Sequence, residues 1–341
     1  MSRPAAEWAE GVAVLGPEWD ACFGLGPGVQ SRRPWFAATE EAALPVGATA
    51  MGVLMRRDGA PASVLPLQSG PGGAGSLTSP YSVLFQPLVD PAGAFEFGLV
   101  AGRKLRRWPV TTLEALDPDW PGLSPFLAGL RRAGLFTVRF DHFGNWHEVM
   151  AGRDWAAYLA DRPGALRETI RRKSRLAERE GVRFTVAATP DALPDALDAY
   201  ESVYARSWKV AEPHPQFSAA LLHRLAPLGQ MRLGVMWRGD VPLAAQYWTV
   251  EGGVATVLKL AHDDAAKALS PGTLLTAYMV RGLLDGGVRE LDFGRGDDPY
   301  KRQWAAVRRQ RIGVVVANPL HPRGLATLAR HGLGRLLKAW R

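Results

Sequence analysis

The sequence of 341 residues has a single cysteine, Cys22, which excludes an intrachain disulfide and a zinc site made of several thiolates. A chain that needs no disulfide is typical of a reducing compartment, so we predict a cytoplasmic protein. Neither a histidine nor a cluster of cationic residues lies near Cys22 in the sequence. We therefore expect its side chain to be a small buried apolar group and not a nucleophile.

The sequence also lacks long apolar runs and the common motifs of several enzyme classes. No run approaches the roughly 20 apolar residues that span a bilayer, and residues 1–10 lack the apolar segment of a secretory signal. No Walker motif and no Gly-x-Ser-x-Gly element occurs, and the glycines of residues 24–28 follow no strand, as a dinucleotide-binding turn would. His142 and His147 do not have the spacing of zinc ligands, so we predict no metal.

The composition is that of a folded protein, with 47% hydrophobic and 22% charged residues. The length is sufficient for two domains of ordinary size. The formal net charge of +8 favours anionic partners such as phosphates, nucleotides, nucleic acid or an acidic membrane face.

Much of this positive charge lies in one segment that we predict to be a helix, residues 164–181. Leu166, Ile170 and Leu176 give it an apolar stripe at helical spacing. Its polar face is rich in arginine, and six basic residues oppose two acidic ones between residues 167 and 179. A solvated amphipathic helix explains this pattern, and a contact with tRNA or an acidic carrier protein is the alternative. The residues expected to make that contact are Arg167, Arg171, Arg172 and Arg175.

The remaining C-terminal half predicts strands and helices in a clear order. We expect helices at residues 192–208, 218–225 and 271–285, and strands at residues 182–186, 231–238, 242–250, 254–260, 289–293 and 313–317. This order indicates an α/β architecture in which an antiparallel meander precedes a crossover helix.

The N-terminal half contains an echo of this meander. Gly52-Val-Leu-Met-Arg-Arg-Asp-Gly-Ala-Pro61 resembles Gly234-Val-Met-Trp-Arg-Gly-Asp-Val-Pro242, a strand, a polar turn, a proline and a return strand. The echo predicts a duplicated module. We place one module at residues 1–150 and a second at residues 151–320, followed at residues 321–341 by a C-terminal helix that packs on the first module.

The most informative segment is Leu291-Asp-Phe-Gly-Arg-Gly-Asp-Asp-Pro-Tyr-Lys-Arg-Gln-Trp304, where an apolar strand changes into a charged turn. Stability alone requires no such mixture. Two glycines allow the backbone to turn sharply or to approach a ligand, so the segment predicts a functional site.

A second candidate site lies where the third strand of the meander is followed by a long helix. Ser270 occupies the predicted N-cap, Pro271 the first helical position, and Gly272 follows. The start of such a helix attracts anions, although an ordinary capped helix has the same pattern. Lys259 lies in the preceding apolar strand, where it needs a partner or access to water.

Together these residues resemble the GNAT-type acyltransferase domain of CelD-like proteins, which are related to the FemAB aminoacyl transferases. The likeness is carried by Gly-Asp-x-Pro-Tyr-Lys-x-x-Trp after a strand ending in Asp-Phe, by Ser-Pro-Gly at a helix start, and by a lysine and Asp263 before it. It covers residues 160–315 well and the N-terminal half loosely. It implies two tandem GNAT-like modules, each a mixed, mostly antiparallel sheet flanked by helices.

The resemblance also implies a donor-binding loop at Lys267-Ala-Leu-Ser-Pro-Gly272, which departs at two positions from the family's Gln/Arg-x-x-Gly-x-Gly/Ala pattern. The implied donor is an acyl-CoA, with acetyl-CoA as the first choice. The residues expected to bind it are Lys259, Lys267, Ser270, Gly272, Arg295 and Gly296.

In the implied reaction an amine attacks an activated acyl carbonyl, which requires a base, oxyanion donors and an acid. Lys301, in an element similar to the Lys-x-x-Phe of FemAB-type proteins, is expected to stabilise a developing oxyanion or a phosphate of the donor. The candidate acid is Tyr300, and the candidate bases are Asp292, Asp263 and Asp298. Structural roles remain open, because Asp297 or Asp298 could cap the turn and Asp292 could pair with Arg295.

We therefore predict an acyl-CoA-dependent N-acyltransferase that acts on a small-molecule amine or sugar-nucleotide acceptor, such as an amino sugar or another precursor of the envelope or exopolysaccharide. One alternative is a FemAB-like transferase that uses aminoacyl-tRNA. The other is a non-catalytic module that senses a nucleotide, suggested by Arg308, Arg309 and Arg311. The sequence identifies neither the acceptor nor the oligomeric state.

Overall fold

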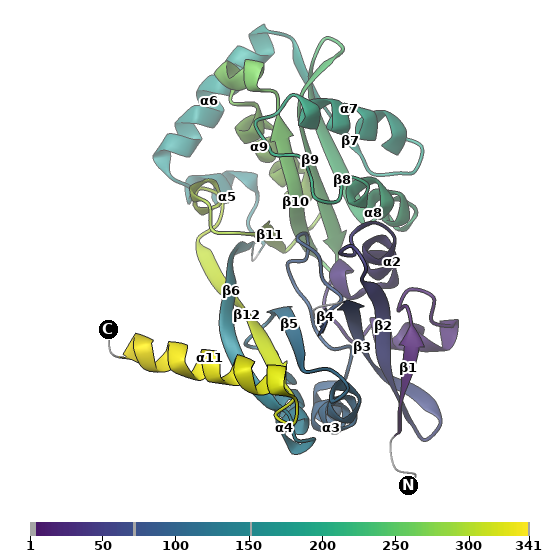
Figure 1. Cartoon of the computed structure of the whole chain (residues 1–341). Helices are drawn as coiled ribbons and strands as arrows, with labels where there is room; N and C mark the ends of the chain where they lie inside the picture. The colour runs from purple at the N-terminus through teal and green to yellow at the C-terminus, as the bar shows by residue number, and fades with distance from the viewer. Residues whose placement is uncertain (1–4, 71–72, 151, 340–341) are drawn as a thin grey trace. The chain divides into compact units, whose positions relative to one another are not determined.

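The computed structural model describes residues 5–70, 73–150 and 152–339. The chain divides into two compact units, one formed by residues 1–143 and 310–341 and the other by residues 144–309. The sequence placed module boundaries at residues 150 and 320, whereas the units divide a few residues earlier at each point. Both divisions fall inside long strands, β6 and β12 (Figure 1).

The first unit is a mixed sheet with strand order β1-β2-β3-β4-β5-β12, flanked by helices. Its only parallel strand pair among the described residues is β4 with β5. Its strands are β1 (Ala5–Glu10), β2 (Thr49–Arg57), β3 (Ala60–Gly70), β4 (Gly73–Ser76), β5 (Val110–Leu116) and β12 (Val307–Ala317). Its helices are α1 (Asp20–Phe23), α2 (Arg33–Ala42), α3 (Ala94–Leu105), α4 (Leu123–Arg132) and α11 (Pro322–Ala339).

The second unit has the strand order β6-β11-β10-β9-β8-β7. In Figure 1, α7 lies in front of this sheet and α9 behind it. Its strands are β6 (Phe136–Val149), β7 (Val182–Ala187), β8 (Met231–Arg238), β9 (Val241–Glu251), β10 (Val254–His262) and β11 (Glu290–Arg295). Its helices are α5 (Trp155–Ala160), α6 (Gly164–Arg179), α7 (Leu193–Ala205), α8 (Phe217–Leu225), α9 (Pro271–Asp285) and α10 (Pro299–Arg302).

These units confirm the predicted α/β class, since each is a mixed, mostly antiparallel sheet flanked by helices. The echo in the sequence corresponds to two hairpins, β2–β3 and β8–β9. The pairing register shifts between Met55 and Arg56 in one hairpin and between Met236 and Trp237 in the other, at the points where Arg56 pairs with Pro61 and Trp237 with Pro242. The likeness therefore extends from the residues to an irregularity of the backbone.

The strands at one edge of each sheet come from distant parts of the chain. In the first unit β5 pairs with β12, with Ala317 opposite Val110. In the second unit β11 pairs with β6, with Glu290 opposite Val149. Each half of the sequence therefore supplies a strand that completes the sheet built by the other half.

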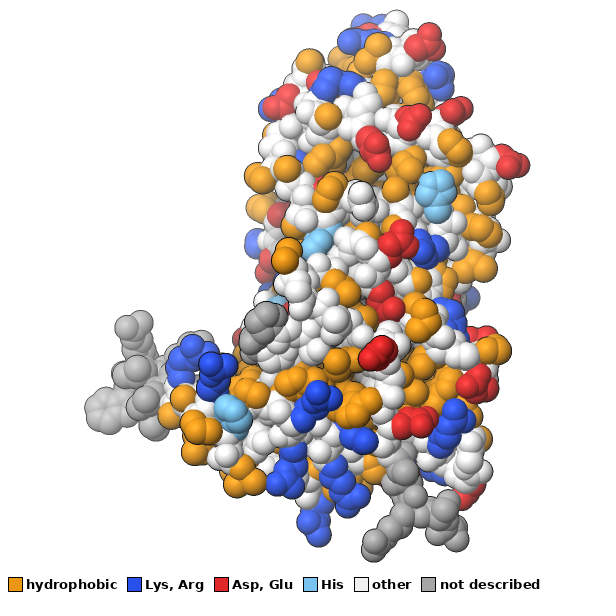
Figure 2. All heavy atoms as spheres, turned by 45° about the vertical axis from the view of Figure 1, so that its right-hand side comes forward, with side chains coloured by type: hydrophobic (Ala, Val, Ile, Leu, Met, Phe, Trp, Pro, Cys, Tyr) orange, Lys and Arg blue, Asp and Glu red, His pale blue; other side chains and the backbone are white. Residues whose placement is uncertain are grey.

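The core of the second unit fixes the elements that carry the candidate site. Trp248 of β9 and Phe293 of β11 meet edge to face with ring centroids 5.6 Å apart, although β10 lies between these strands in the sheet. Leu274, Leu275 and Val280 on α9 are buried in the same cluster. On the face shown in Figure 2, acidic and basic side chains are interspersed in the upper part of the view, whereas several basic side chains lie together in the lower part.

Candidate functional site

The site lies where β10 and β11 stop pairing. These parallel strands pair only from Val254 opposite Glu290 to Thr256 opposite Asp292. Beyond this point β10 has a register shift between Val257 and Lys259, and β11 continues beside β6. The carboxyl ends of two parallel strands no longer share hydrogen bonds there, which is the edge where α/β sheets commonly bind ligands.

Lys301 is held at this end by the turn that follows β11. Gly294 and Gly296 have φ angles of 71° and 110°, values that side-chain-bearing residues rarely adopt. The chain therefore reverses, and Lys301 Nζ lies 2.5 Å from the carbonyl oxygen of Arg295 and 3.4 Å from Asp298 Oδ2. Its side chain is 15% exposed, and burial lowers the pKa of its ammonium group.

Trp304 holds the C-terminal end of this turn in the core. Its side chain is fully buried, and its carbonyl oxygen accepts hydrogen bonds from the Tyr158 hydroxyl at 2.5 Å and from Arg162 Nη1 at 3.0 Å. Glu148 accepts from Arg162 and from the amide of Ala306. The Lys-x-x-Trp element thus has two parts, a buried tryptophan that fixes the short helix α10 and a lysine that the helix presents.

Asp292 is a structural carboxylate in this structure. It is 4% exposed, and Oδ1 accepts hydrogen bonds of 2.7 Å from Asn145 Nδ2 and from the amide of Gly294. Its Oδ2 pairs with Arg309 Nη2 at 2.5 Å, whereas the sequence suggested Arg295 as the partner. The role of Asp292 as a base stays a prediction, but all its contacts favour holding the strand end together.

The other two candidate bases also have structural contacts. Asp263 accepts from the amide of Ala265 at the start of a short 3-10 helix, Asp264–Leu269. It also pairs with Arg206 Nε at 2.8 Å, and this hydrogen bond lowers the pKa of Asp263. Asp298 is 51% exposed and pairs with Lys301.

Two further lysines and a glutamate gather near Lys301. Lys259 Nζ pairs with Glu212 Oε1 at 2.5 Å, and both side chains are largely buried. Burial, together with the positive charges of Lys259 and Lys301, lowers the pKa of Lys209 to about 8. Lys209 and Glu212 lie between α7 and α8 in a segment without a motif, so sequence reasoning missed both.

The start of α9 differs in detail from the prediction. Ser270 is the N-cap residue, but it has a left-handed backbone with φ of 51° and its side chain makes no capping hydrogen bond. Its carbonyl accepts from the amides of Thr273 and Leu274, and Pro271 has no N–H. Gly272 is therefore the main backbone donor that this helix start offers to an anion. Lys267 is exposed and pairs with Asp264 at 3.1 Å.

Tyr300 joins α10 to this helix start. Its hydroxyl oxygen lies 3.2 Å from the carbonyl oxygen of Gly272 and 2.9 Å from Thr276 Oγ1. Burial raises the pKa of Tyr300, so the phenol keeps its proton at neutral pH. The structure thus brings Tyr300 and Gly272 together, as one site requires.

His262 is a further residue to which sequence reasoning gave no role, although it lies close to the predicted helix start. It is the last residue of β10, and its Nδ1 lies 3.3 Å from the carbonyl oxygen of Asp263. Its ring centroid is 4.2 Å from that of Trp208, and burial lowers the pKa of His262 below its ordinary value. A neutral imidazole at the end of β10 can accept a proton. Its position directly before Asp263 was the available signal.

The basic helix α6 lies beside the loop that precedes α9, because Lys173 Nζ donates to the carbonyl oxygen of Ala268. Arg171 pairs with Glu168 at 2.6 Å on its exposed face. The predicted contact residues Arg167, Arg171, Arg172 and Arg175 are all exposed.

The arginines that suggested a nucleotide-sensing module are engaged in ion pairs. Arg308 pairs with Asp297, and Arg309 with Asp292 and Glu290. Arg311 is buried and pairs with Asp117 at 2.8 Å. These contacts favour structural roles for the three side chains.

Within the described ranges, no group of three or more histidine, cysteine or acidic residues is placed to hold a metal ion. Over the same ranges, no helix has the length and apolarity that crossing a bilayer requires.

Comparison with known proteins matches residues 164–302 to the family described as Acetyltransferase (GNAT) domain. No curated protein matches. Among solved structures the chain is similar to FemX, with a TM-score of 0.60 at 12% identity over 91% of this chain and 96% of that chain. It is also similar to L-PGS from Bacillus licheniformis, with a TM-score of 0.56 at 12% identity over 89% and 92% of the two chains. A tandem GNAT protein from the clavulanic acid biosynthesis pathway gives 0.50 at 15% identity over 92% and 99%.

The family match covers all the candidate site residues and confirms the predicted class of enzyme, an acyltransferase. The three solved structures, at 12–15% identity, show a shared fold over nearly the whole chain. Together they confirm the resemblance to GNAT-type proteins related to the FemAB transferases.

Replacing Asp292 tests whether it acts mainly as a structural group. We expect Asp292→Asn to lower the free energy of unfolding by about 2 kcal/mol, because a largely buried arginine loses one carboxylate but keeps Glu290 and Asn145. The matched change Asp298→Asn, at an exposed position, should stay within about 0.5 kcal/mol of the wild type. Urea denaturation measures both, and equal stability of the two variants would contradict the structural role.

Labelling with acetic anhydride tests the environment of Lys209. Its reactivity should rise with a midpoint at about pH 8, because the neutral amine is the reactive form. An ordinary lysine has a pKa of about 10.4. Mass spectrometry after brief labelling across the pH range follows each lysine, with the exposed Lys267 as internal reference. In Lys259→Met the midpoint for Lys209 should move upward, and a midpoint unchanged by this substitution would argue against the lysine cluster.

Proposed function

We propose that the acetyltransferase (GNAT) domain at residues 164–302 transfers an acyl group from acyl-CoA, with acetyl-CoA the first choice, to an amine by direct attack on the acyl carbonyl. The observation that carries this proposal is the position of Lys301. The glycine turn and the buried Trp304 hold it at the separated carboxyl ends of β10 and β11. The family match supports an acyl donor.

The residues present fit an anionic donor such as coenzyme A. Lys209 and Lys259 lie near Lys301, the amide of Gly272 lies at the start of α9, and Lys267 is exposed before it. Glu212 pairs with Lys259, so an arriving phosphate would compete with this carboxylate. The helix start offers few amides, so we assign most of the anion binding to the lysines.

In the proposed reaction the amine nitrogen forms a bond to the carbonyl carbon while the carbon–sulfur bond breaks. Lys301 stabilises the negative charge that develops on the carbonyl oxygen. His262, neutral because burial lowers its pKa, accepts the proton from the amine. Tyr300 keeps its proton and is the group that can return one to the leaving thiolate. Asp292 and Asp263 hold the backbone around these groups.

For the acceptor we propose an amino sugar or another amine that serves as a precursor of the envelope or exopolysaccharide, with the enzyme in the cytoplasm. The family resemblance supports this class of acceptor, and the single cysteine supports the cytoplasm as the compartment.

Acetyl-CoA tests the proposal directly. We expect calorimetry to detect its binding, and thiol release to show slow hydrolysis that increases when amines such as glucosamine are added. Lys301→Met should lower the rate about 100-fold or more, because it removes the charge at the developing oxyanion. Lys104→Met, on α3 of the first unit, is the control and should keep the wild-type rate. Neither binding nor hydrolysis with acetyl-CoA and longer acyl-CoAs would overturn the proposal.

A second candidate is transfer from aminoacyl-tRNA, favoured by the exposed arginines of α6 beside the loop before α9. The fold shared with FemX agrees with this alternative. Its test is the binding of charged tRNA at increasing salt, where phosphate contacts give a steep loss of affinity. Replacing Arg171, Arg172 and Arg175 by Gln should reduce the slope of log affinity against log salt by about three, and Arg131→Gln on α4 should leave it unchanged. A flat salt response in the wild type would reject tRNA.

A further inference from the structure

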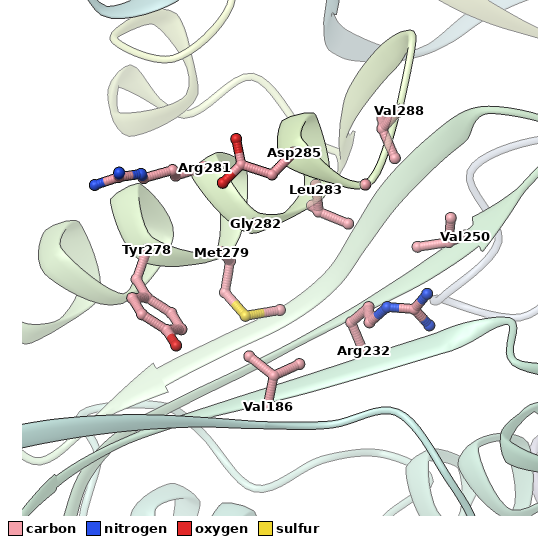
Figure 3. Close-up of a pocket in the computed structure, with 11 residues that line it drawn as sticks. Val186, Arg232, Val250, Tyr278, Met279, Arg281, Gly282, Leu283, Asp285 and Val288 are labelled. Carbon is pink, nitrogen blue, oxygen red and sulfur yellow. The ribbon is translucent and has the colours of Figure 1, made fainter. Parts of the chain in front are cut away.

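A pocket of about 400 Å³ lies at the far end of α9 from the proposed transfer site. Its walls come from the C-terminal half of α9, from β7, β8 and the end of β9, and from the residues that follow α9 (Figure 3). The apolar side chains that line it are Val186, Val250, Tyr278, Met279, Leu283 and Val288.

This pocket is separate from the lysine cluster. The transfer site is at Gly272 in the first turn of α9, whereas Gly282 lines the pocket. Ten helical residues correspond to about 15 Å along the helix axis. A molecule in the pocket therefore occupies a second site.

One glycine, Gly282, lines the pocket, and another, Gly234, lies behind Met279 of its wall. A Cβ atom added at Gly282 would have no heavy atom within 4 Å, so this helical position is open space. A Cβ at Gly234 on β8 would lie 2.3 Å from Met279 Sδ, so a glycine there lets Met279 approach the sheet. Glycine is disfavoured inside helices and strands, and both positions leave room that alanine would reduce.

The pocket is apolar at its walls and exposed at its mouth. Val186 and Tyr278 are 39% and 43% exposed, although both are large apolar residues. Figure 3 shows Met279 and Val186 facing each other across the pocket, with Arg232 beside Val250. Such a surface favours an aliphatic group that removes it from water.

The charged residues of the pocket are Arg232, Arg281 and Asp285, which give an excess of one positive charge. Arg232 Nη1 donates to the carbonyl oxygens of Gly229 and Met231 at 2.8 and 2.7 Å, so the guanidinium is held in place. Within the described part of the chain, Arg281 and Asp285 have no ion-pair partner. A fixed guanidinium beside apolar walls is complementary to a carboxylate attached to a hydrocarbon chain.

We propose that this pocket binds an aliphatic carboxylate of medium chain length, with the chain between Met279 and Val186 and the carboxylate on Arg232. Binding is non-covalent and does not depend on the transfer reaction. The ligand class follows from the apolar walls and from the sign of the charge at the rim.

Octanoate is the probe, and calorimetry with the full chain measures its affinity. We expect octanoate to bind, and acetate, which lacks the chain, to bind too weakly to detect. Octanol, which lacks the charge, should bind about tenfold more weakly than octanoate, a difference of about 1.4 kcal/mol. Arg232→Met should cause a similar tenfold loss, and Arg103→Met on α3 should cause none.

Two variants fill the pocket. Gly282→Leu places a side chain in open space and replaces glycine by a better helix former, so we expect it to fold and to lose octanoate binding. Val186→Trp fills the mouth from the half-exposed side of β7 and should have the same effect, with circular dichroism to verify folding. Wild-type affinity for octanoate in either folded variant, or equal affinity of the wild type for octanol, would overturn the proposal.

Discussion

The buried ion pair between Asp292 and Arg309 is the interaction on which the second unit depends most. It joins β11 to β12, and Asn145 of β6 bonds to both side chains. A carboxylate and a guanidinium that are largely removed from water must satisfy each other, so a shift in the register of these strands would leave a largely buried charge without its partner. The same carboxylate also holds the start of the glycine turn, because it accepts a hydrogen bond from the amide of Gly294. The position of Lys301 therefore depends on a contact several residues away.

The segment from Asp292 to Trp304 combines two kinds of residue that the sequence cannot tell apart. Its ends are anchors, one in an ion pair and the other buried in the core. Between them, Tyr300 and Lys301 are presented toward the start of α9 and the lysine cluster. Asp292 and Lys301 are both largely buried, so neither residue type nor burial distinguishes an anchor from a presented group; their contacts do.

Most of the fold could be predicted from the sequence, because apolar periodicity and glycine turns are local signals. The predicted helix at residues 271–285 coincides with α9, and the predicted strand at residues 231–238 coincides with β8. The partner of Asp292 could not be predicted, since Arg309 lies 17 positions away on another strand. Lys209 and Glu212 could not be predicted as site residues for a related reason, since they lie near Lys301 only in the folded chain. The side chain of Ser270 makes no cap because the backbone there is left-handed, which the Ser-Pro-Gly pattern does not reveal.

The exchange of β6 and β12 has a consequence for the order in which the protein is made. The first unit needs residues 312–317 to pair with β5, and these follow the second unit, residues 144–309, in the chain. During synthesis from the N-terminus, β5 is therefore an open sheet edge until residues 312–317 have left the ribosome. An unpaired edge invites contacts with other nascent chains. The first unit therefore reaches its full sheet only after all of the second unit has been synthesised, although most of its own strands are made first.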